Sequence, residues 1–516
     1  MVASLSPEIF LSTLALIGAV IVVAALLSGF VERSGLPQVI VFLALGAVIG
    51  PAGLKLLDTG VDSPILRVVS TLSLVLVLFT DAVSLNLQEI RHSKLLAILV
   101  VGPGTIVSAF LVAMAGYWLL GLSFPLAAII GAALASTDPV LLRGFLRSPS
   151  LPAGVRQALR LESGMNDAVL LPIVLVAMAA INGQHMKSSD WAALITNVLL
   201  VSPAAGALVG LAAVASLELV RRRMGVRRDY ESIYSLGVAF AAYAAAEAVH
   251  GSGFLAAFAA GLTISALDVE LCDCFLEYGE TTAEMALLFT FVLFGTSLIW
   301  SGFAIAGPMT LLFTLSVFVL RPVAFISALL PVGIPWRDRG LIAWFGPRGL
   351  SSLLLVLLAV FGNVPGSRDL LTISCLVVLA SIILHGFSPF LFLRPTRFKE
   401  REPVQRGPEN PPALPAPTAD SNADESGETC SLTCTFDPTG PRQVLLENPE
   451  YIEVNELLRL EQASIRVVVA DARTDRTYNE SDREIPGAVR LHPDRAALDA
   501  EHMKIPLSAV IAVLCA

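Results

Sequence analysis

Long apolar stretches, separated by short polar segments, occupy the first 400 residues of the chain. A stretch of about 18 or more apolar residues is long enough to cross a bilayer as a helix. The sequence predicts thirteen spanning helices, of which those at 65–80 and 253–267 are shorter than this length: 8–30, 36–57, 65–80, 94–120, 124–146, 156–181, 191–219, 232–250, 253–267, 283–301, 303–330, 338–361 and 370–392. The expected fold class is therefore an all-α polytopic membrane protein.

Basic residues between the predicted spans orient the chain in the membrane. With the N-terminus outside, the cytoplasmic segments hold 16 Lys and Arg, including the run at 221–228, whereas the outer loops hold four. Because positive residues accumulate on the cytoplasmic side, the sequence predicts a plasma- or inner-membrane protein with a cytoplasmic C-terminal tail. The span at 8–30 has no basic flank before it and no small-residue cleavage site after it, so we expect it to be retained.

The distribution of charge separates the apolar region from the tail. The 516 residues are 55% hydrophobic and 15% charged, against about 25% charged in soluble domains, which excludes an ordinary soluble enzyme and a nucleic-acid-binding protein. Residues 1–400 hold 23 basic and 23 acidic side chains, so the whole net charge of -9 belongs to residues 401–516. We expect a transmembrane domain at 1–399, a flexible Pro-rich acidic linker at 400–447 and a small α/β domain at 448–516.

A charged side chain inside a span costs about 2.5–3.5 kcal/mol on insertion scales, and six such side chains are candidates for a functional role. Two groups share this position, carboxylates in spans five, six and eight and arginines in spans eleven and twelve: Asp138, Glu162, Asp167, Glu247, Arg321 and Arg348. Charge inside the spans, rather than in rings at their mouths, is typical of a transporter's ion site and less typical of a channel.

Span five contains a proline that predicts a broken helix. Pro139 cannot donate a backbone hydrogen bond and disfavours helical geometry at Asp138, so we expect an interruption at Thr137–Asp138. Interrupted helices at membrane depth are where secondary transporters bind substrate or coupling ions. The alternative is a simple proline kink in which Asp138 serves as a helix cap.

Span six presents two polar faces. Helical spacing places Ser163 and Asp167 on one face and Glu162 and Asn166 on another. The first face offers hydroxyl and carboxylate oxygens to a cation. The second offers Glu162 to an arginine on a neighbouring helix, and we expect Arg321 to form this structural ion pair.

Asp167 then has no fixed cationic partner, and an apolar setting disfavours its charged form. Such a carboxylate can hold either a proton or a metal cation, and binding one expels the other. That competition is sufficient for antiport. Asn166 supplies a dipole without charge, so one cation per proton is the simplest stoichiometry.

Four motifs together are specific for one family. STDP at 136–139, ESGMND at 162–167, RP at 321–322 and GPRGL at 346–350 resemble the monovalent cation:proton antiporters of the NhaP/sodium–hydrogen exchanger type, over residues 8–395. One departure is Pro347, where the family more often has Leu or Gly before the arginine.

The resemblance implies a homodimer with two inverted repeats in each copy, and broken spans five and twelve that cross in a mobile core. It implies that four side chains hold the cation: Thr137, Asp138, Ser163 and Asp167. It also pairs Glu162 with Arg321, gives Asn166 and Arg348 supporting roles, and makes the exchange electroneutral through the Asn-Asp order. No cofactor, metal beyond the transported cation, or nucleic-acid partner is expected.

The expected function is therefore pH homeostasis by elevator-type exchange of Na⁺, with Li⁺ and K⁺ as alternatives, for protons. A potassium-selective efflux system on the same scaffold is a second hypothesis. A membrane-anchored sulfur-transfer enzyme or sensor is a third, from another class, but an anchor needs neither interior charges nor a broken helix.

The third hypothesis comes from the tail, where strand-like segments alternate with helical spacing. A strand ending at Asp471-Ala-Arg473, the IPGA turn at 485–488 and a strand leading to Cys515 resemble a rhodanese-like domain, in which that cysteine carries persulfide sulfur. The chain continues one residue past Cys515, so we expect an incomplete, regulatory module without sulfurtransferase activity. A buried strand-end thiol is the alternative for Cys515, and we expect all six cysteines to be free thiols.

Overall fold

A computed structural model of the chain describes ten segments: residues 38–57, 59–85, 94–146, 151–183, 187–224, 228–267, 273–392, 467–471, 488–491 and 510–514, with Gly18, Val22 and Leu26 besides. The chain divides into two compact units, Met1–Pro403 and Val404–Ala516. The predicted span at 8–30 and the linker at 400–447 lie largely outside the described residues, and the predicted domain boundaries stay predictions.

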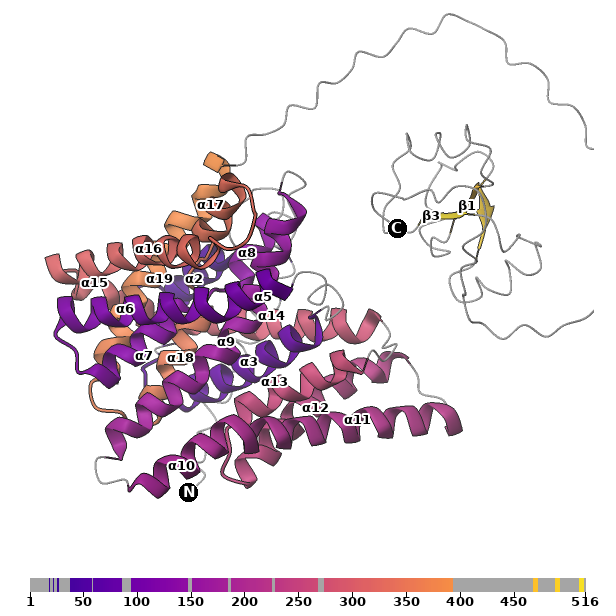
Figure 1. Cartoon of the computed structure of the whole chain (residues 1–516), viewed down its shortest axis with the longest axis horizontal. Helices are drawn as coiled ribbons and strands as arrows, with labels where there is room; N and C mark the ends of the chain where they lie inside the picture. The colour runs from indigo at the N-terminus through magenta and orange to yellow at the C-terminus, as the bar shows by residue number, and fades with distance from the viewer. Residues whose placement is uncertain are drawn as a thin grey trace, which may run out of the picture. The chain divides into compact units, whose positions relative to one another are not determined.

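The first unit is helical (Figure 1). Its first half contains α2 (Gln38–Ile49), α3 (Pro64–Val83), α5 (Lys94–Leu99), the π-turn η1 (Val100–Gly104), α6 (Thr105–Leu120), α7 (Phe124–Ala135), α8 (Pro139–Leu146) and α9 (Ala153–Asn182). Its second half contains α10 (Ser188–Thr196), η2 (Asn197–Val201), α11 (Ser202–Met224), α12 (Arg228–Ala248), α13 (Gly253–Ala266), α14 (Asp273–Thr296), η3 (Leu298–Trp300), α15 (Ser301–Ala304), α16 (Pro308–Ala328), α17 (Trp336–Trp344), α18 (Leu350–Phe361) and α19 (Ser367–Phe392).

Many of these helices suit a membrane by length and composition. In the part of the chain that the structure describes, seven are long and apolar enough to cross a bilayer, or eight if one bent pair counts as a single span. Four further apolar helices are shorter, each between 10 and 17 residues long. The protein is thus a multi-pass membrane protein, and the count of thirteen spans stays a prediction.

Prolines account for two local departures from the predicted spans. The apolar run at 36–57 forms a helix only to Ile49, because Gly50 and Pro51 begin a turn in which Leu54 N–H donates to the carbonyl of Val48. Pro103 lacks an N–H group, and the helix accommodates it by widening to a π-turn at η1.

Predicted spans five and twelve are each interrupted in the structure. The predicted break in span five is confirmed, since α7 ends at Ala135 and α8 begins at Pro139. Span twelve is broken as the resemblance implied, between Trp344 of α17 and Leu350 of α18. The two breaks contact each other, because the N–H of Asp138 donates to the carbonyl of Pro347 at 3.0 Å.

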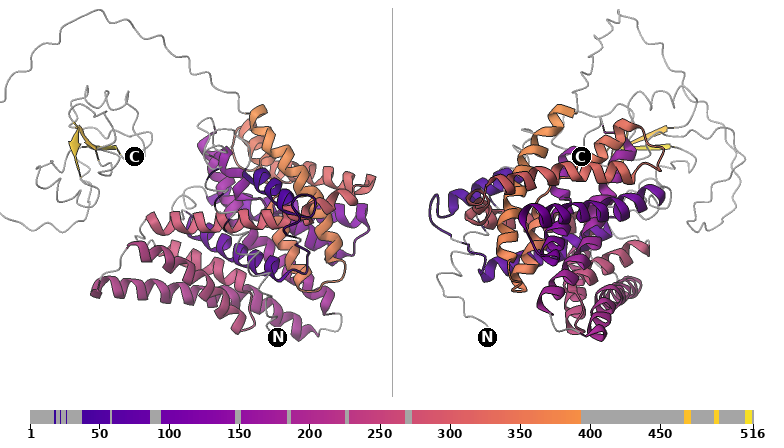
Figure 2. Two further views of the ribbon diagram at one scale, coloured as in Figure 1. Left: turned by 180° about the vertical axis from the view of Figure 1, so that it is seen from behind. Right: turned by 60° about the vertical axis from the view of Figure 1, so that its left-hand side comes forward.

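The helices form two groups by their mutual contacts. The first contains α2, α3 and α11–α14, and we call it the small-residue group because glycines lie at its close helix contacts. The second contains α5–α9 and α15–α19, and we call it the crossing group because it holds both broken helices. Figures 1 and 2 show α11, α12 and α13 side by side along one side of this unit and α15, α16 and α17 along the opposite side. Both broken helices belong to the crossing group.

In the second unit the structure describes one small sheet. Strands β1 (Val467–Asp471), β2 (Val489–Arg490) and β3 (Val510–Leu514) are parallel in the order β2-β1-β3. The register pairs Val467 with Val510 and Ala470 with Val489. The strands lie where the sequence predicts them. Cys515 lies outside the described residues, so the rhodanese-like domain stays a prediction.

Candidate site at the crossing of the broken helices

Asp138 lies where two half-helices begin. Its Oδ1 accepts hydrogen bonds from the N–H groups of Val140 (2.8 Å) and Leu141 (3.4 Å) at the start of α8, and its Oδ2 accepts one from Leu350 N–H (2.6 Å) at the start of α18. A Cβ at position 349 would collide with this carboxylate, so the close approach requires Gly349. One negative charge thus stabilises two positive helix N-termini.

Arg348 satisfies the carbonyl oxygens at the C-terminal end of α7. Its Nη1 donates to the carbonyl oxygens of Ala135 (2.8 Å) and Ser136 (3.0 Å), the last turn of that half-helix. Its own N–H donates to Ser381 Oγ on α19 at 2.6 Å. Only 1% of Arg348 is exposed, so its position is fixed by these buried contacts.

Arg321 satisfies the carbonyl oxygens at the C-terminal end of α17 and also forms an ion pair with Glu162. Its Nη1 donates to the carbonyl oxygens of Ile342 (3.1 Å) and Ala343, and its Nη2 lies 2.6 Å from Glu162 Oε2. The other oxygen of Glu162 accepts a hydrogen bond from Thr137 Oγ1 at 2.8 Å. The pair therefore joins α16, α17 and α9 at the crossing.

Asp167 differs from these groups because hydroxyls, not charges, are its partners. It is 4% exposed, and its Oδ1 accepts a hydrogen bond from Ser136 Oγ at 2.5 Å. The Ser351 side chain is a second polar neighbour of this carboxylate, and the Asp138 carboxylate is near enough to repel it. Within the described ranges Asp167 forms no ion pair, so its charge depends on what binds there.

The remaining predicted residues lie near the crossing but have other partners. Thr137 contacts Glu162 and not Asp167, while the Ser163 hydroxyl donates to the carbonyl of Arg160 in its own helix (3.3 Å). Asn166 Nδ2 donates to the carbonyl of Thr137 at 3.5 Å. The contacts of Asp138 are those expected of a cap, and the assignment of these residues as cation ligands stays a prediction.

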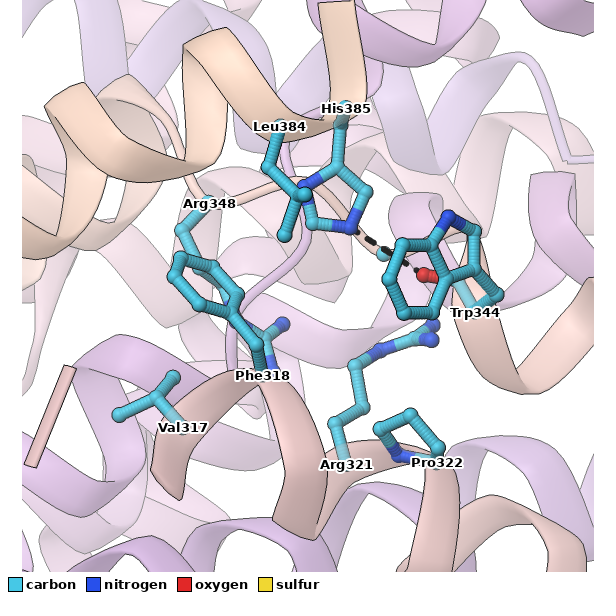
Figure 3. A pocket seen from close by; sticks show the side chains of 9 residues that line it. Val317, Phe318, Arg321, Pro322, Trp344, Arg348, Leu384 and His385 are labelled. Atoms are coloured by element: carbon cyan, nitrogen blue, oxygen red, sulfur yellow. Dashed lines mark hydrogen bonds between the residues drawn. The ribbon is translucent and has the colours of Figure 1, made fainter. Parts of the chain in front are cut away.

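Ser136, Ser351 and His385 are site residues that the sequence reasoning missed. His385 on α19 places Nε2 at 3.2 Å from the carbonyl oxygen of Trp344 and Nδ1 at 3.2 Å from Ser381 Oγ. Figure 3 shows it over a small cavity that Arg321 and Arg348 also line. The sequence offered one signal for the two serines, their position in the motifs. Ser136 is the first residue of STDP, and Ser351 lies three residues after Arg348.

Glu247 lies away from the crossing and forms a local contact. Its Oε1 accepts a hydrogen bond from Gly253 N–H at 3.0 Å, at the start of α13. His250 occupies the connecting turn with φ of 59°. These contacts favour capping for Glu247.

Comparison with known proteins agrees with this arrangement. The family described as "Sodium/hydrogen exchanger, transmembrane" matches residues 19–394. A solved structure of the sodium proton antiporter MjNhaP1 from Methanocaldococcus jannaschii at pH 8 superposes with a TM-score of 0.61 at 20% identity, covering 75% of this chain and 98% of that one. The similarity extends through all of that protein's fold.

Curated relatives carry names for two cations. The K(+)/H(+) antiporter NhaP of Alkalimonas amylolytica is 25% identical over 388 residues, and the K(+)/H(+) antiporter NhaP2 of Shewanella baltica is 28% identical over 389. These matches cover 73% and 72% of this chain but only 65% of each relative's length. The Na(+)/H(+) antiporter NhaP of Pseudomonas aeruginosa is 26% identical over 62% of this chain and 79% of its own. The family model matches well over half of the residues of this chain, and the fold agrees with that of MjNhaP1. The chain therefore belongs to the transmembrane sodium/hydrogen exchanger family.

Proposed function

We propose that the protein exchanges a monovalent cation for a proton across the membrane, with Asp167 as the group that holds each in turn. The observation that supports this is its setting: a buried carboxylate with hydroxyl partners at the contact of two broken helices. Burial penalises the unneutralised carboxylate, so a proton and a cation compete for one site.

The charges at the crossing support a one-to-one exchange. Three carboxylates, Asp138, Glu162 and Asp167, lie with two guanidinium groups, Arg321 and Arg348. When all are ionised, the set has one negative charge in excess, which one proton or one monovalent cation neutralises. Exchange of one for the other then moves no net charge, which fits the proposed electroneutral mechanism.

The two helix groups support alternating access of the elevator type. Both breaks and all five charges lie in the crossing group, whereas the small-residue group has continuous helices around α11 and α13. Movement of the crossing group against the other would therefore carry the intact site across the membrane. In the same proposal the small-residue group contributes the contact between two copies of a homodimer.

K⁺ and Na⁺ are both candidates for the transported cation. The Alkalimonas and Shewanella relatives are named for K⁺ and the Pseudomonas relative for Na⁺. The sequence expectation placed Na⁺ first, and the relatives make K⁺ an equal candidate, so both belong in one assay with Li⁺.

The test is proton movement in vesicles that contain the purified full-length protein. Addition of Na⁺, K⁺ or Li⁺ should drive proton movement in the wild type, and Asp167→Asn should reduce it to the level of empty vesicles. Asp190→Asn is the matched control, because Asp190 is an exposed side chain at the start of α10 and should keep wild-type rates.

Retained exchange in a folded Asp167→Asn variant would overturn the assignment. The same rates with and without an imposed membrane potential would support electroneutral exchange, and a rate that follows the potential would exclude it.

A further inference from the structure

Ser136 is the residue whose hydroxyl lies at the proposed transport carboxylate. It is wholly buried at the end of α7 and its Oγ donates to Asp167 Oδ1 at 2.5 Å. The serine that helical spacing placed on the same face as Asp167, Ser163, instead donates to the carbonyl of Arg160 in its own helix. The oxygen nearest to the carboxylate thus comes from the broken helix α7.

The backbone of Ser136 is held independently of its side chain. Its carbonyl accepts hydrogen bonds from Arg348 Nη1 (3.0 Å) and from Ser352 Oγ (3.4 Å), and its backbone is extended, with φ of -60° and ψ of 139°. The side chain is therefore fixed in position on the Asp167 side while its hydroxyl can still rotate about one bond.

Two other side-chain oxygens are candidates for the same site. The Ser351 side chain at the start of α18 is also a polar neighbour of Asp167, so both broken helices place a hydroxyl near it. Asn166, which is fully buried and adjacent to Asp167, has a side-chain carbonyl oxygen with no hydrogen-bond partner in the described segments. Alkali cations are held by oxygen ligands, including uncharged ones.

We propose that Ser136 is a cation-binding and selectivity-determining residue whose hydroxyl donates to Asp167 in the empty site and turns its oxygen to the cation in the loaded site. A serine hydroxyl has one donor and two acceptor positions, so it can serve both states without moving the backbone. Ser351 does the same from α18. The proposal rests on the proposed function, since it names ligands of that site.

The experiment measures initial rates of proton movement against Na⁺, K⁺ and Li⁺ concentration at one pH, with the full-length protein in vesicles. Ser136→Ala should raise the KM about three- to tenfold, as expected for loss of one polar contact, and change the maximal rate by less than about twofold. The three cations should be affected unequally, because ions of different radius use the remaining oxygens differently. Ser136→Thr keeps the hydroxyl and should restore a KM near that of the wild type.

Ser70→Ala is the matched control, because Ser70 is also buried but lies on α3, where its hydroxyl donates to the carbonyl of Leu66 in its own helix. Its KM values should remain those of the wild type. If Ser136→Ala does not fold by size-exclusion chromatography, Ser351→Ala provides the same test.

Unchanged KM values for all three cations in folded Ser136→Ala or Ser351→Ala would overturn this inference and leave the proposed function intact. Absence of exchange in the wild type with every cation would overturn the proposed function, and this inference with it.

Discussion

In the small-residue group helices touch backbone to backbone, whereas the crossing group adds buried charges to such contacts, for example to that of Gly131 on α7 with α6. A Cβ at Gly206 of α11 would collide with the carbonyl of Ala256 on α13, and one at Gly46 of α2 would collide with backbone atoms of Val292 and Gly295 on α14. Packing between small residues is the usual source of helix association in lipid, where the hydrophobic effect contributes little. The first group is therefore specified by shape.

The crossing group is specified by charge placement. Asp138 serves two helix N-termini, and Arg348 and Arg321 serve the C-termini of α7 and α17. Each half-helix end would otherwise leave polar backbone groups unsatisfied at membrane depth. The small-residue group and the crossing group therefore depend on different interactions. Substitutions in one group should have effects that differ from those in the other.

The largest effect is expected from removing one charge of a buried pair. Arg321→Met leaves Glu162 buried without its partner and also frees the carbonyl groups at the end of α17. Loss of one member of a buried ion pair costs about 3–5 kcal/mol, so we expect a large fall in folded protein and in Tm in detergent.

The double variant Glu162→Gln/Arg321→Met separates charge from shape. If the uncompensated carboxylate causes the damage, the double variant should be more stable than Arg321→Met alone, by a coupling measured in a double-mutant cycle. A wild-type Tm for Arg321→Met would mean that the crossing group does not depend on its charges.

The residues of this charge network were largely accessible from sequence. A charge in a span is expensive, and a proline breaks a helix, so Asp138, Glu162, Asp167 and Arg321 could be placed at one site without coordinates. Arg321, on a neighbouring predicted span, was the expected partner of Glu162, and the two side chains lie 2.6 Å apart.

The hydroxyl partners could not be predicted in this way. Serine and threonine in helices commonly donate to their own backbone, as Ser70 does to Leu66 and Thr80 to Leu76. Membership of the STDP motif is the one local signal for Ser136, but the direction of its side chain depends on where α7 ends relative to α9. Nor does hydropathy show where a span ends, because the apolar run at 36–57 continues through the turn after Ile49.

An intermediate effect is expected in the small-residue group. Gly206→Ala inserts a Cβ against the backbone of α13, which must shift because a carbonyl group cannot rotate away as a side chain can. Overpacking of this kind costs about 1–3 kcal/mol, so Tm should fall by less than in Arg321→Met. The KM of the folded fraction should stay that of the wild type, because no ligand of the proposed site is touched.

Gly237→Ala on α12 is the matched control, since an added Cβ there meets no atom within 4 Å. It should leave Tm unchanged or slightly raised. Equal losses of Tm in both variants would show that the cost comes from helix composition and not from the contact between α11 and α13. A raised KM in Gly206→Ala would show that the two groups are not separable.

The smallest effect is expected where the two groups meet at the surface. Arg368 Nη2 on α19 lies 2.7 Å from Asp62 Oδ1, which precedes α3, and the two side chains are 66% and 76% exposed. Exposed pairs contribute little and are screened by salt, so Asp62→Asn should not change Tm measurably.

Because the pair joins one group to the other, its loss should raise the exchange rate by about twofold at low ionic strength and leave it unchanged at high ionic strength. The measurement is the initial rate in vesicles over a series of choline chloride concentrations, with Arg368→Gln as the reciprocal variant. A change that persists at high salt would place an energetically important contact between the groups and would contradict their independence.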